Sequence, residues 1–323
     1  MSGKGLFLQN VIAVVWDFDM TLSPHYMQKP IFDEYGIDDA LFWEEVRALP
    51  EYYARAGIEI QRDTCYLGHM LSYVKEGKMP GLSNEKLRAL GAKIDLFPGL
   101  PEFFGRLGKV LDRPEFKAGD LRLEHYIVST GLEAMISGTE IAKEVNGIWA
   151  SVFIEEPAGP GTDLSGTPKT GPISQIAGFL DNTTKTRALF EINKGVNANK
   201  NISVNDLIPE EERRVPFKNM IYVADGPSDI PSFSVLREHG GLAYAVYDEN
   251  AEDHYAQVEK LHSGGRVDNF GPANYMPGST TEKWLSLKVE AIAERNMQDR
   301  KDATRSRVQP GPSHLPEHEE EQR

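Results

Sequence analysis

Long apolar runs that end abruptly in polar residues form the most regular pattern in this chain. Three of them lie at residues 11–16, 125–128 and 220–224, and each is followed by aspartate, serine or threonine. Strands buried on both faces of a parallel sheet have this pattern. Two further apolar runs, at residues 149–154 and 242–247, predict additional strands of the same sheet.

Between these runs, apolar residues recur at helical spacing. This spacing predicts helices at residues 102–110, 132–145 and 230–239, and a further helix that begins near Lys185. Strands that alternate with helices are typical of a parallel sheet covered on both faces. The sequence therefore predicts an α/β fold with a Rossmann-like parallel sheet flanked by helices.

A helical insertion is expected after the first strand, because Thr21 and Ser129 lie farther apart in the chain than one crossover helix requires. Between residues 38 and 75 the apolar spacing is helical and is interrupted at Pro50 and Gly57. A third helix is expected to begin at the N-cap residue Ser83. We predict a helical cap at residues 25–95 and an α/β core at 1–24 and 96–297.

The last part of the chain has a different pattern from the core. Apolar spacing fades beyond residue 290, and the chain ends in a run rich in glutamate. A segment with so few large apolar residues buries too little surface to become ordered by itself. We therefore predict a disordered acidic tail at residues 298–323. The segment 155–172, rich in glycine and proline, is expected to form a loop or hairpin.

Composition narrows the classes of function. The chain has 323 residues, of which 40% are hydrophobic, enough for a sizeable core. A net charge of −14 and a pI near 5.1 argue against nucleic-acid binding and against attachment to an anionic membrane. Neither a signal-peptide pattern nor a membrane-spanning run is found, so a cytoplasmic location is expected. Cys65 is the single cysteine, and we assign it no function.

Candidate chemistry is concentrated where the predicted strands end. Asp17 and Asp19 follow the first strand, Ser129 and Thr130 end the second, and Asp225 follows a third, with Asp229 four residues later. In open α/β sheets, ligands bind beyond the carboxyl ends of the strands. Charged groups at the end of a buried strand are unfavourable unless they serve a purpose.

In order, these segments resemble the motifs of the haloacid dehalogenase-like (HAD) hydrolase superfamily, nearest its phosphoserine-phosphatase-like branch. The first motif, DxDxT, matches residues 17–21, and Ser129, Lys185 and the pair Asp225 and Asp229 follow in family order. The resemblance implies that Asp17 is the nucleophile that forms an aspartyl-phosphate. It also implies that Asp19 is the general acid and base.

The resemblance further implies a phosphate site and a magnesium site. Ser129 and the main-chain N–H of Thr130 would bind phosphate oxygens, and Lys185 would neutralise charge; Lys169 is a weaker rival for the lysine role. The Mg²⁺ ligands would be the carboxylates of Asp17 and Asp225 and the main-chain carbonyl of Asp19. For Asp229, a direct metal bond and a hydrogen bond to metal-bound water both stay open.

The function implied is a magnesium-dependent phosphatase that hydrolyses a small phosphorylated metabolite. Two alternatives stay open: a phosphotransferase or mutase with the same intermediate, and a catalytically silent binding protein of the same fold. The sequence does not encode the substrate or the oligomeric state in readable form. His25, Tyr26 and Lys29 are either cleft residues or linker, and the aromatic residues of the insertion serve either cap packing or a dimer contact: Phe42, Trp43, Tyr52 and Tyr53.

Overall fold

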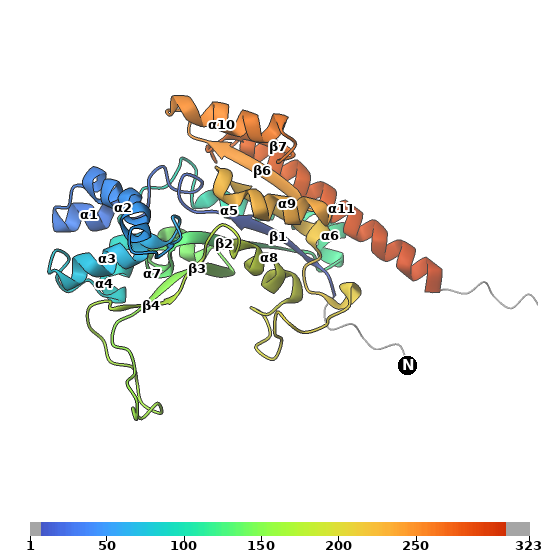
Figure 1. The fold of residues 1–323 in the computed structure, drawn as a ribbon. Helices are drawn as coiled ribbons and strands as arrows, with labels where there is room; N and C mark the ends of the chain where they lie inside the picture. Colours follow the sequence, from blue (N-terminus) through green and yellow to red (C-terminus); the bar gives the residue numbers. More distant parts are fainter. Residues whose placement is uncertain (1–7, 308–323) are drawn as a thin grey trace, which may run out of the picture.

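A seven-stranded sheet forms the centre of the protein, which is known from a computed structural model that describes residues 8–307 (Figure 1). The strand order is β4-β3-β2-β1-β5-β6-β7. All neighbouring strands are parallel except β3 and β4, which form an antiparallel hairpin. The strands are β1 Val11–Trp16, β2 Arg122–Leu132, β3 Gly147–Ile154, β4 Gln175–Gly178, β5 Met220–Ala224, β6 Leu242–Tyr247 and β7 Asn269–Pro272. The predicted Rossmann-like sheet is therefore confirmed.

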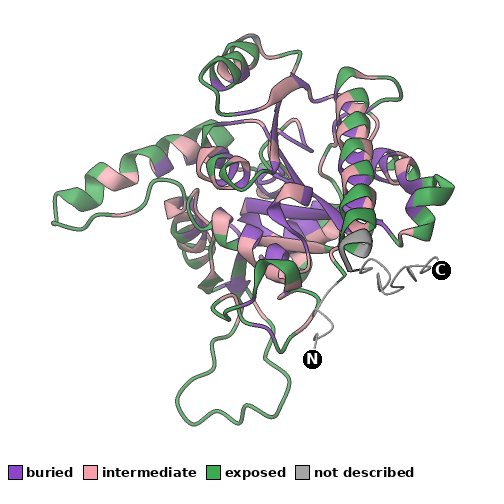
Figure 2. Ribbon diagram, turned by 90° about the vertical axis from the view of Figure 1, so that its right-hand side faces the viewer, coloured by how far each residue is buried: buried purple, intermediate pink, exposed green. Residues whose placement is uncertain are grey.

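Helices cover both faces of this sheet, and β1 is buried between them (Figure 2). Alternate side chains of β1 enter two separate apolar clusters, because successive residues of a strand point to opposite faces. One face packs against α8 Lys185–Lys194, α9 Ile230–Glu238 and α10 Glu252–Ser263. The other packs against α5 Glu102–Gly108, α6 Pro114–Ala118, α7 Glu133–Gly138 and α11 Thr280–Arg307.

The insertion after β1 forms four helices that lie together at one end of the sheet (Figure 1). They are α1 Lys29–Tyr35, α2 Asp39–Ala54, α3 Cys65–Lys75 and α4 Asn84–Gly91. The helix α4 begins after the N-cap Ser83, whose side chain accepts a hydrogen bond from the Lys86 N–H, as expected. The helix α1 was not predicted. Its apolar positions Ile31 and Phe32 are adjacent and give a weak helical pattern.

The interruption predicted at Pro50 is wrong, because α2 runs through this residue. Proline has no N–H to donate to the carbonyl of Val46 one turn earlier. The thiol of Cys65, on the neighbouring helix α3, lies 3.8 Å from that carbonyl and 3.3 Å from the carbonyl of Arg62, and it has one hydrogen to donate. The side chain of Cys65 therefore packs against the oxygen that the proline leaves free.

The predicted crossover helix at 132–145 is shorter than expected. The strand β2 extends to Leu132, α7 ends at Gly138, and a 3₁₀ turn follows at Glu140–Lys143. At Gly138 a Cβ atom would lie 1.9 Å from the carbonyl oxygen of Arg88 on α4. The helices α4 and α7 are therefore in close contact, and α4 anchors the cap to the core.

The expectation of disorder from residue 298 is wrong for residues 298–307, because α11 continues to Arg307. Contacts with the core account for this extension: Lys218 pairs with Asp299 at 2.7 Å, and the Arg300 side chain donates to the carbonyl of Gly119. These are polar contacts that an apolar pattern does not register. Residues 308–323 of the predicted tail lie outside the described residues. No helix among residues 8–307 is long and apolar enough to span a membrane.

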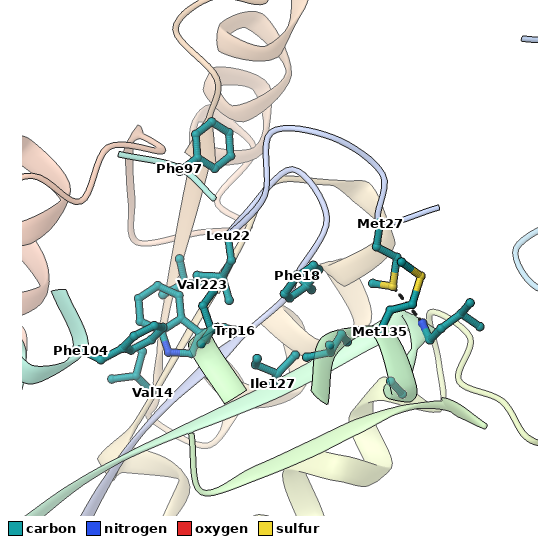
Figure 3. Close-up of a cluster of buried hydrophobic side chains, with 14 of the residues drawn as sticks. Val14, Trp16, Phe18, Leu22, Met27, Phe97, Phe104, Ile127, Met135 and Val223 are labelled. Carbon is teal, nitrogen blue, oxygen red and sulfur yellow. Dashed lines mark hydrogen bonds between the residues drawn. The ribbon is translucent and has the colours of Figure 1, made fainter. Parts of the chain in front are cut away.

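Apolar side chains fix the chain on both sides of the first motif (Figure 3). Trp16 ends β1 and meets the ring of Phe104 edge-on, with 5.6 Å between the ring centroids. Met27, which follows the motif, packs beside Gly131, and its sulfur accepts a hydrogen bond of 3.0 Å from the N–H of Leu132. The loop that carries Asp19 is therefore held against the end of β2.

Candidate active site

The residues singled out from the sequence meet at the carboxyl ends of three adjacent strands. Asp17 directly follows β1, and its N–H donates to Val223 of β5 at 2.9 Å. Ser129 lies near the end of β2, where the register with β3 becomes irregular after Val128. Asp225 directly follows β5. Because β2, β1 and β5 are parallel neighbours, their ends bring these side chains to one edge.

Lys185 links two of the carboxylates. It is the first residue of α8, and only 1% of its surface is exposed. Its Nζ lies 2.9 Å from Oδ1 of Asp17 and 2.8 Å from Oδ1 of Asp229. The rival Lys169 lies in the exposed loop between β3 and β4, so the lysine at this site is Lys185.

Asp229 is completely buried and receives hydrogen bonds on both carboxylate oxygens. Besides Lys185, the hydroxyl of Tyr222 donates to Oδ1 and that of Ser228 donates to Oδ2, each at 2.8 Å. Sequence reasoning missed Tyr222, although a tyrosine within an otherwise aliphatic strand was a visible signal. Gln257 of α10 was also missed; its Nε2 donates to the carbonyl of Asp225 at 3.2 Å.

The cluster contains more negative than positive charge. Oxygen atoms of Asp17, Asp225 and Asp229 all lie within 4.8 Å of one another, and Lys185 is the cation bonded to two of them. Burial and the charge of Asp229 raise the pKa of Asp17 to about 6, although Lys185 opposes the shift. Burial and both neighbouring aspartates raise the pKa of Asp225 well above its usual value. Burial alone would lower the pKa of Lys185, but the carboxylates outweigh it and raise that pKa.

This donor set suits a hard divalent cation. The converging atoms are all carboxylate oxygens, which Mg²⁺ prefers, and the cluster lacks positive charge. Among the described residues no side chain donates a hydrogen bond to the carboxylate of Asp225, so this group is free to bind a metal. Asp229 differs from Asp225, because protein donors already occupy both of its oxygens.

Asp19 is turned away from the direction of β1. The next residue, Met20, has a left-handed conformation with φ of 57°, and Oδ1 of Asp19 accepts a hydrogen bond of 2.9 Å from the N–H of Met27. Burial, followed by the charge of Asp17, raises the pKa of Asp19 to about 8. The Asp19 carboxyl is therefore protonated near neutral pH, in contrast to an ordinary surface aspartate.

Ser129 and Thr130 complete the edge on the side of β2. The Oγ of Ser129 accepts a hydrogen bond of 3.0 Å from the N–H of Gly131, which leaves the hydroxyl hydrogen available to a bound group. The Thr130 carbonyl accepts hydrogen bonds from Tyr66 at 2.8 Å and from Ser151 at 3.2 Å. Tyr66 belongs to α3, so the cap is bonded directly to this edge.

A cavity of about 580 Å³ lies between the strand ends and the cap. Asp19, Thr130 and Gly131 form its core side. The cap side consists of residues from α2, α3 and the segments before them: Tyr26, Gln28, Asp39, Ala40, Trp43, Val46, Arg47, Arg62, Asp63 and Tyr66. The predicted cleft between the carboxyl edge and the helical insertion is therefore present.

The residues whose roles the sequence left open differ in position: some line a cavity, and others are buried in the cap or exposed on its surface. Tyr26 lines the large cavity, and a smaller adjacent pocket of about 160 Å³ has both His25 and Lys29 in its lining. Phe42 is buried within the cap. Two aromatic residues near the end of α2 are exposed instead: Tyr52 and Tyr53.

Comparison with known proteins identifies a family but no described function. No model of a known protein family matches the sequence. An uncharacterized protein of Borreliella burgdorferi is 36% identical over 287 residues, which cover 87% of this chain and 97% of the relative. The chain belongs to the same family as that protein.

Solved structures with similar folds include HAD-type hydrolases. A HAD family hydrolase from Salmonella enterica serovar Typhi matches with a TM-score of 0.48 and 14% identity, over 86% of this chain and 70% of the other. A phosphoserine phosphatase in the form of a phospho-aspartyl intermediate analogue matches with a TM-score of 0.43 and 16% identity, over 81% and 93%. A probable phosphoserine phosphatase from Vibrio cholerae matches with a TM-score of 0.45 and 14% identity, over 90% of this chain and 68% of the other.

Proposed function

We propose that this protein is a magnesium-dependent phosphatase of the HAD type that hydrolyses a small phosphorylated metabolite. The observation that carries the proposal is the set of carboxylates around Lys185, whose Nζ is 2.9 Å from Asp17 and 2.8 Å from Asp229. A buried carboxylate at a strand end, held by a lysine beside an excess of negative charge, suits nucleophilic attack on phosphorus assisted by a cation.

In this mechanism Asp17 attacks the phosphorus atom and the bond to the leaving oxygen breaks. Lys185 keeps Asp17 ionised and compensates negative charge on the transferring group. The Ser129 hydroxyl and the Thr130 N–H hold phosphate oxygens. Bound Mg²⁺, held by Asp17, Asp225 and the Asp19 carbonyl, would offset the repulsion between the two anions.

Proton transfer falls to Asp19. Its protonated carboxyl donates to the departing alkoxide as the bond to phosphorus breaks, and the resulting carboxylate then removes a proton from the water that attacks the phospho-aspartate. The hydrogen bond from the Met27 N–H holds this carboxyl beside the cavity, where the leaving group would lie. One group therefore serves both half-reactions.

Release of inorganic phosphate from a panel of phosphorylated metabolites tests the proposal. We expect Mg²⁺-dependent release that a chelator abolishes and that Asp17→Asn reduces below detection. Asp95→Asn replaces an exposed aspartate and serves as the matched control. Undiminished turnover by Asp17→Asn, or turnover after complete removal of metal, would contradict the proposal.

The same assay separates the two alternatives. A phosphotransferase would form an aspartyl-phosphate but give a phosphorylated product other than inorganic phosphate. A silent binding protein would give neither product with any donor. The presence of the reacting groups supports an enzyme over a silent binding protein, and Asp19 and Thr130 line a cavity of about 580 Å³ that can take a leaving group.

A further inference from the structure

The cavity beside Asp19 has an aromatic wall. The rings of Tyr26, Trp43 and Tyr66 follow one another, with 5.5 Å between the first two ring centroids and 5.8 Å between the last two. A cavity of about 580 Å³ is far larger than a phosphoryl group needs and is typical of a site for a ring-sized ligand. Asp19, the proposed proton donor to the leaving group, lines the same cavity as this wall.

Trp43 joins this wall to the packed interior of the cap, because its ring meets Phe42 edge-on with 5.3 Å between the ring centroids. Phe42, one residue before Trp43, is buried and packs against Phe32, with 4.8 Å between ring centroids. Tyr26 is instead 53% exposed, and Tyr66 is fixed by its hydrogen bond to the Thr130 carbonyl. The indole N–H of Trp43 has no hydrogen-bond partner among residues 8–307. An exposed ring such as Tyr26, beside the partly exposed ring of Trp43, can bind a planar ligand by stacking.

Two arginines lie at the same cavity. Arg47 of α2 and Arg62, just before α3, both line it, and neither guanidinium has a hydrogen bond or ion pair within the described part of the chain. Besides Asp19, two acidic residues line the cavity. Asp39 is the first residue of α2, where negative charge is favourable, and Asp63 lies two positions before α3. The unpaired positive charges therefore remain available to an anionic ligand group.

Gln28 adds an uncharged polar side chain to the cavity lining. The side chain is 2% exposed, and its Oε1 is buried without a hydrogen-bond partner. Because this atom is closed to water, a ligand in the cavity does not reach it unless the side chain moves.

We infer that the substrate is a phosphomonoester whose leaving group is a planar ring bearing a second anionic group. The ring lies along Tyr26 and Trp43, and its anionic group lies near Arg47 and Arg62. This inference rests on the proposed function, because it places the phosphoryl group at Asp17.

Calorimetric binding of phosphonates that cannot be hydrolysed tests the inference without requiring turnover. With saturating Mg²⁺, we expect benzylphosphonate to bind about fivefold more tightly than cyclohexylmethylphosphonate, which has similar size and charge but no π system. We expect 4-carboxybenzylphosphonate to bind about fivefold more tightly than its 4-carbamoyl analogue, because only the carboxylate attracts the arginines.

Variants of the cavity lining assign each preference to its residues. Tyr26→Leu and Trp43→Leu should remove most of the preference for the aromatic ring, and melting curves check that the cap stays folded. If Trp43→Leu unfolds the cap, Tyr26→Leu alone tests the preference for the aromatic ring. Tyr26 is half exposed, so its replacement should leave the cap folded. Tyr52→Leu is the matched control, since Tyr52 is exposed on the same helix but does not line the cavity.

The double variant Arg47→Met and Arg62→Met should abolish the carboxylate preference and leave the ring preference intact. Arg55→Met, just beyond the end of α2, should leave both preferences unchanged. Equal affinity for the two members of each pair, or a carboxylate preference that survives the double variant, would overturn the inference. Phosphate release without either preference would refute the inference alone. These preferences in a protein that never cleaves a phosphate ester would instead refute the proposed function.

Discussion

Two clusters of buried charge lie on this sheet, and they differ in how well their charges balance. Near the start of β2, Arg214 and Glu124 form a two-point ion pair, with 2.5 Å from Nη2 to Oε1 and 2.7 Å from Nη1 to Oε2. The Tyr126 hydroxyl donates to Glu124 and accepts from Arg214. In this cluster one acid faces one base, and we call it the balanced pair.

At the opposite end of the strands, three aspartates converge, and Lys185 is bonded to two of them, Asp17 and Asp229. We call this set the acidic cluster. Burial makes unpaired charge unfavourable, so a cluster that only supports the fold should be balanced, as the pair at Arg214 is. The difference supports the proposed metal site, and the predictions below test this contrast.

Removing the cation of the acidic cluster should have the largest effect. In Lys185→Met, Asp17 and Asp229 would lose their hydrogen-bonded positive charge, and the three carboxylates would face one another without a cation. At about pH 8 without Mg²⁺, we expect the free energy of unfolding to fall by about 3 to 5 kcal/mol. Turnover should fall by about 10² to 10³ even with Mg²⁺. Denaturant unfolding and phosphate release measure the two effects; a stable, active variant would contradict the role of Lys185.

The metal should stabilise the protein more as the pH rises. The pKa of Asp17 is raised from 3.8 to about 6, so its native carboxyl holds its proton above the pH at which the unfolded carboxyl loses it. The metal-free protein therefore loses stability as the pH rises from about 4 to about 6, by an amount on the order of 3 kcal/mol, and the loss is complete above that range. Mg²⁺ relieves this repulsion.

Melting curves with and without Mg²⁺ at about pH 5 and pH 8 measure that effect. The gain in melting temperature should be larger at the higher pH and should disappear in Asp225→Asn. Arg214→Met should keep the whole gain, because the balanced pair binds no metal. A gain that is independent of pH, or that survives Asp225→Asn, would show that the ion binds elsewhere.

Breaking the balanced pair should reduce stability without changing the chemistry. Arg214→Met leaves Glu124, whose side chain is only 10% exposed, without its partner. We expect the free energy of unfolding to fall by about 2 kcal/mol. This is less than for a fully buried pair, because Arg214 is partly exposed. The turnover number of the folded enzyme should be unchanged. A fall of tenfold or more in turnover would show that the two clusters are coupled.

The smallest effect should come from the hydroxyl of Tyr222, which bonds to Asp229 at 2.8 Å. Tyr222→Phe removes one hydrogen bond to a charged group, so we expect a loss of about 1 to 2 kcal/mol in the free energy of unfolding. Phe233→Leu, in the same apolar cluster, controls for altered packing. If Tyr222→Phe reduces the gain in stability from Mg²⁺ more than Phe233→Leu does, the hydroxyl positions the acidic cluster. Equal effects of the two variants would limit the role of Tyr222 to packing.

The sequence was most informative where one short segment determines the structure. Asp17, Asp19 and Asp225 follow apolar runs, and parallel strands bring such ends together, so their convergence was predictable. Lys185 was preferred over Lys169 from the local pattern, and the structure places it at Asp17. The sheet class followed from the same periodicity.

Contacts between distant segments were not predictable in this way. The aromatic wall depends on how α2 and α3 pack, and the hydrogen bond from Gln257 to Asp225 spans 32 positions. The carbonyl that Pro50 leaves free in α2 meets a thiol from another helix. Periodicity reports which face of an element is apolar, but it does not report which polar partner that element meets.

The most direct test of the account locates the phosphoryl group on the protein. Asp19→Asn should still allow attack by Asp17 on an activated donor such as an acyl phosphate, but it should slow hydrolysis of the intermediate by about 10² to 10⁴. Mass spectrometry of this variant after mixing with donor and Mg²⁺ should therefore find a phosphoryl group on Asp17. The variant Asp17→Asn should acquire none. Phosphorylation of Asp17→Asn, or a label on any other residue of Asp19→Asn, would contradict the assignment of the acidic cluster as a centre of phosphoryl transfer.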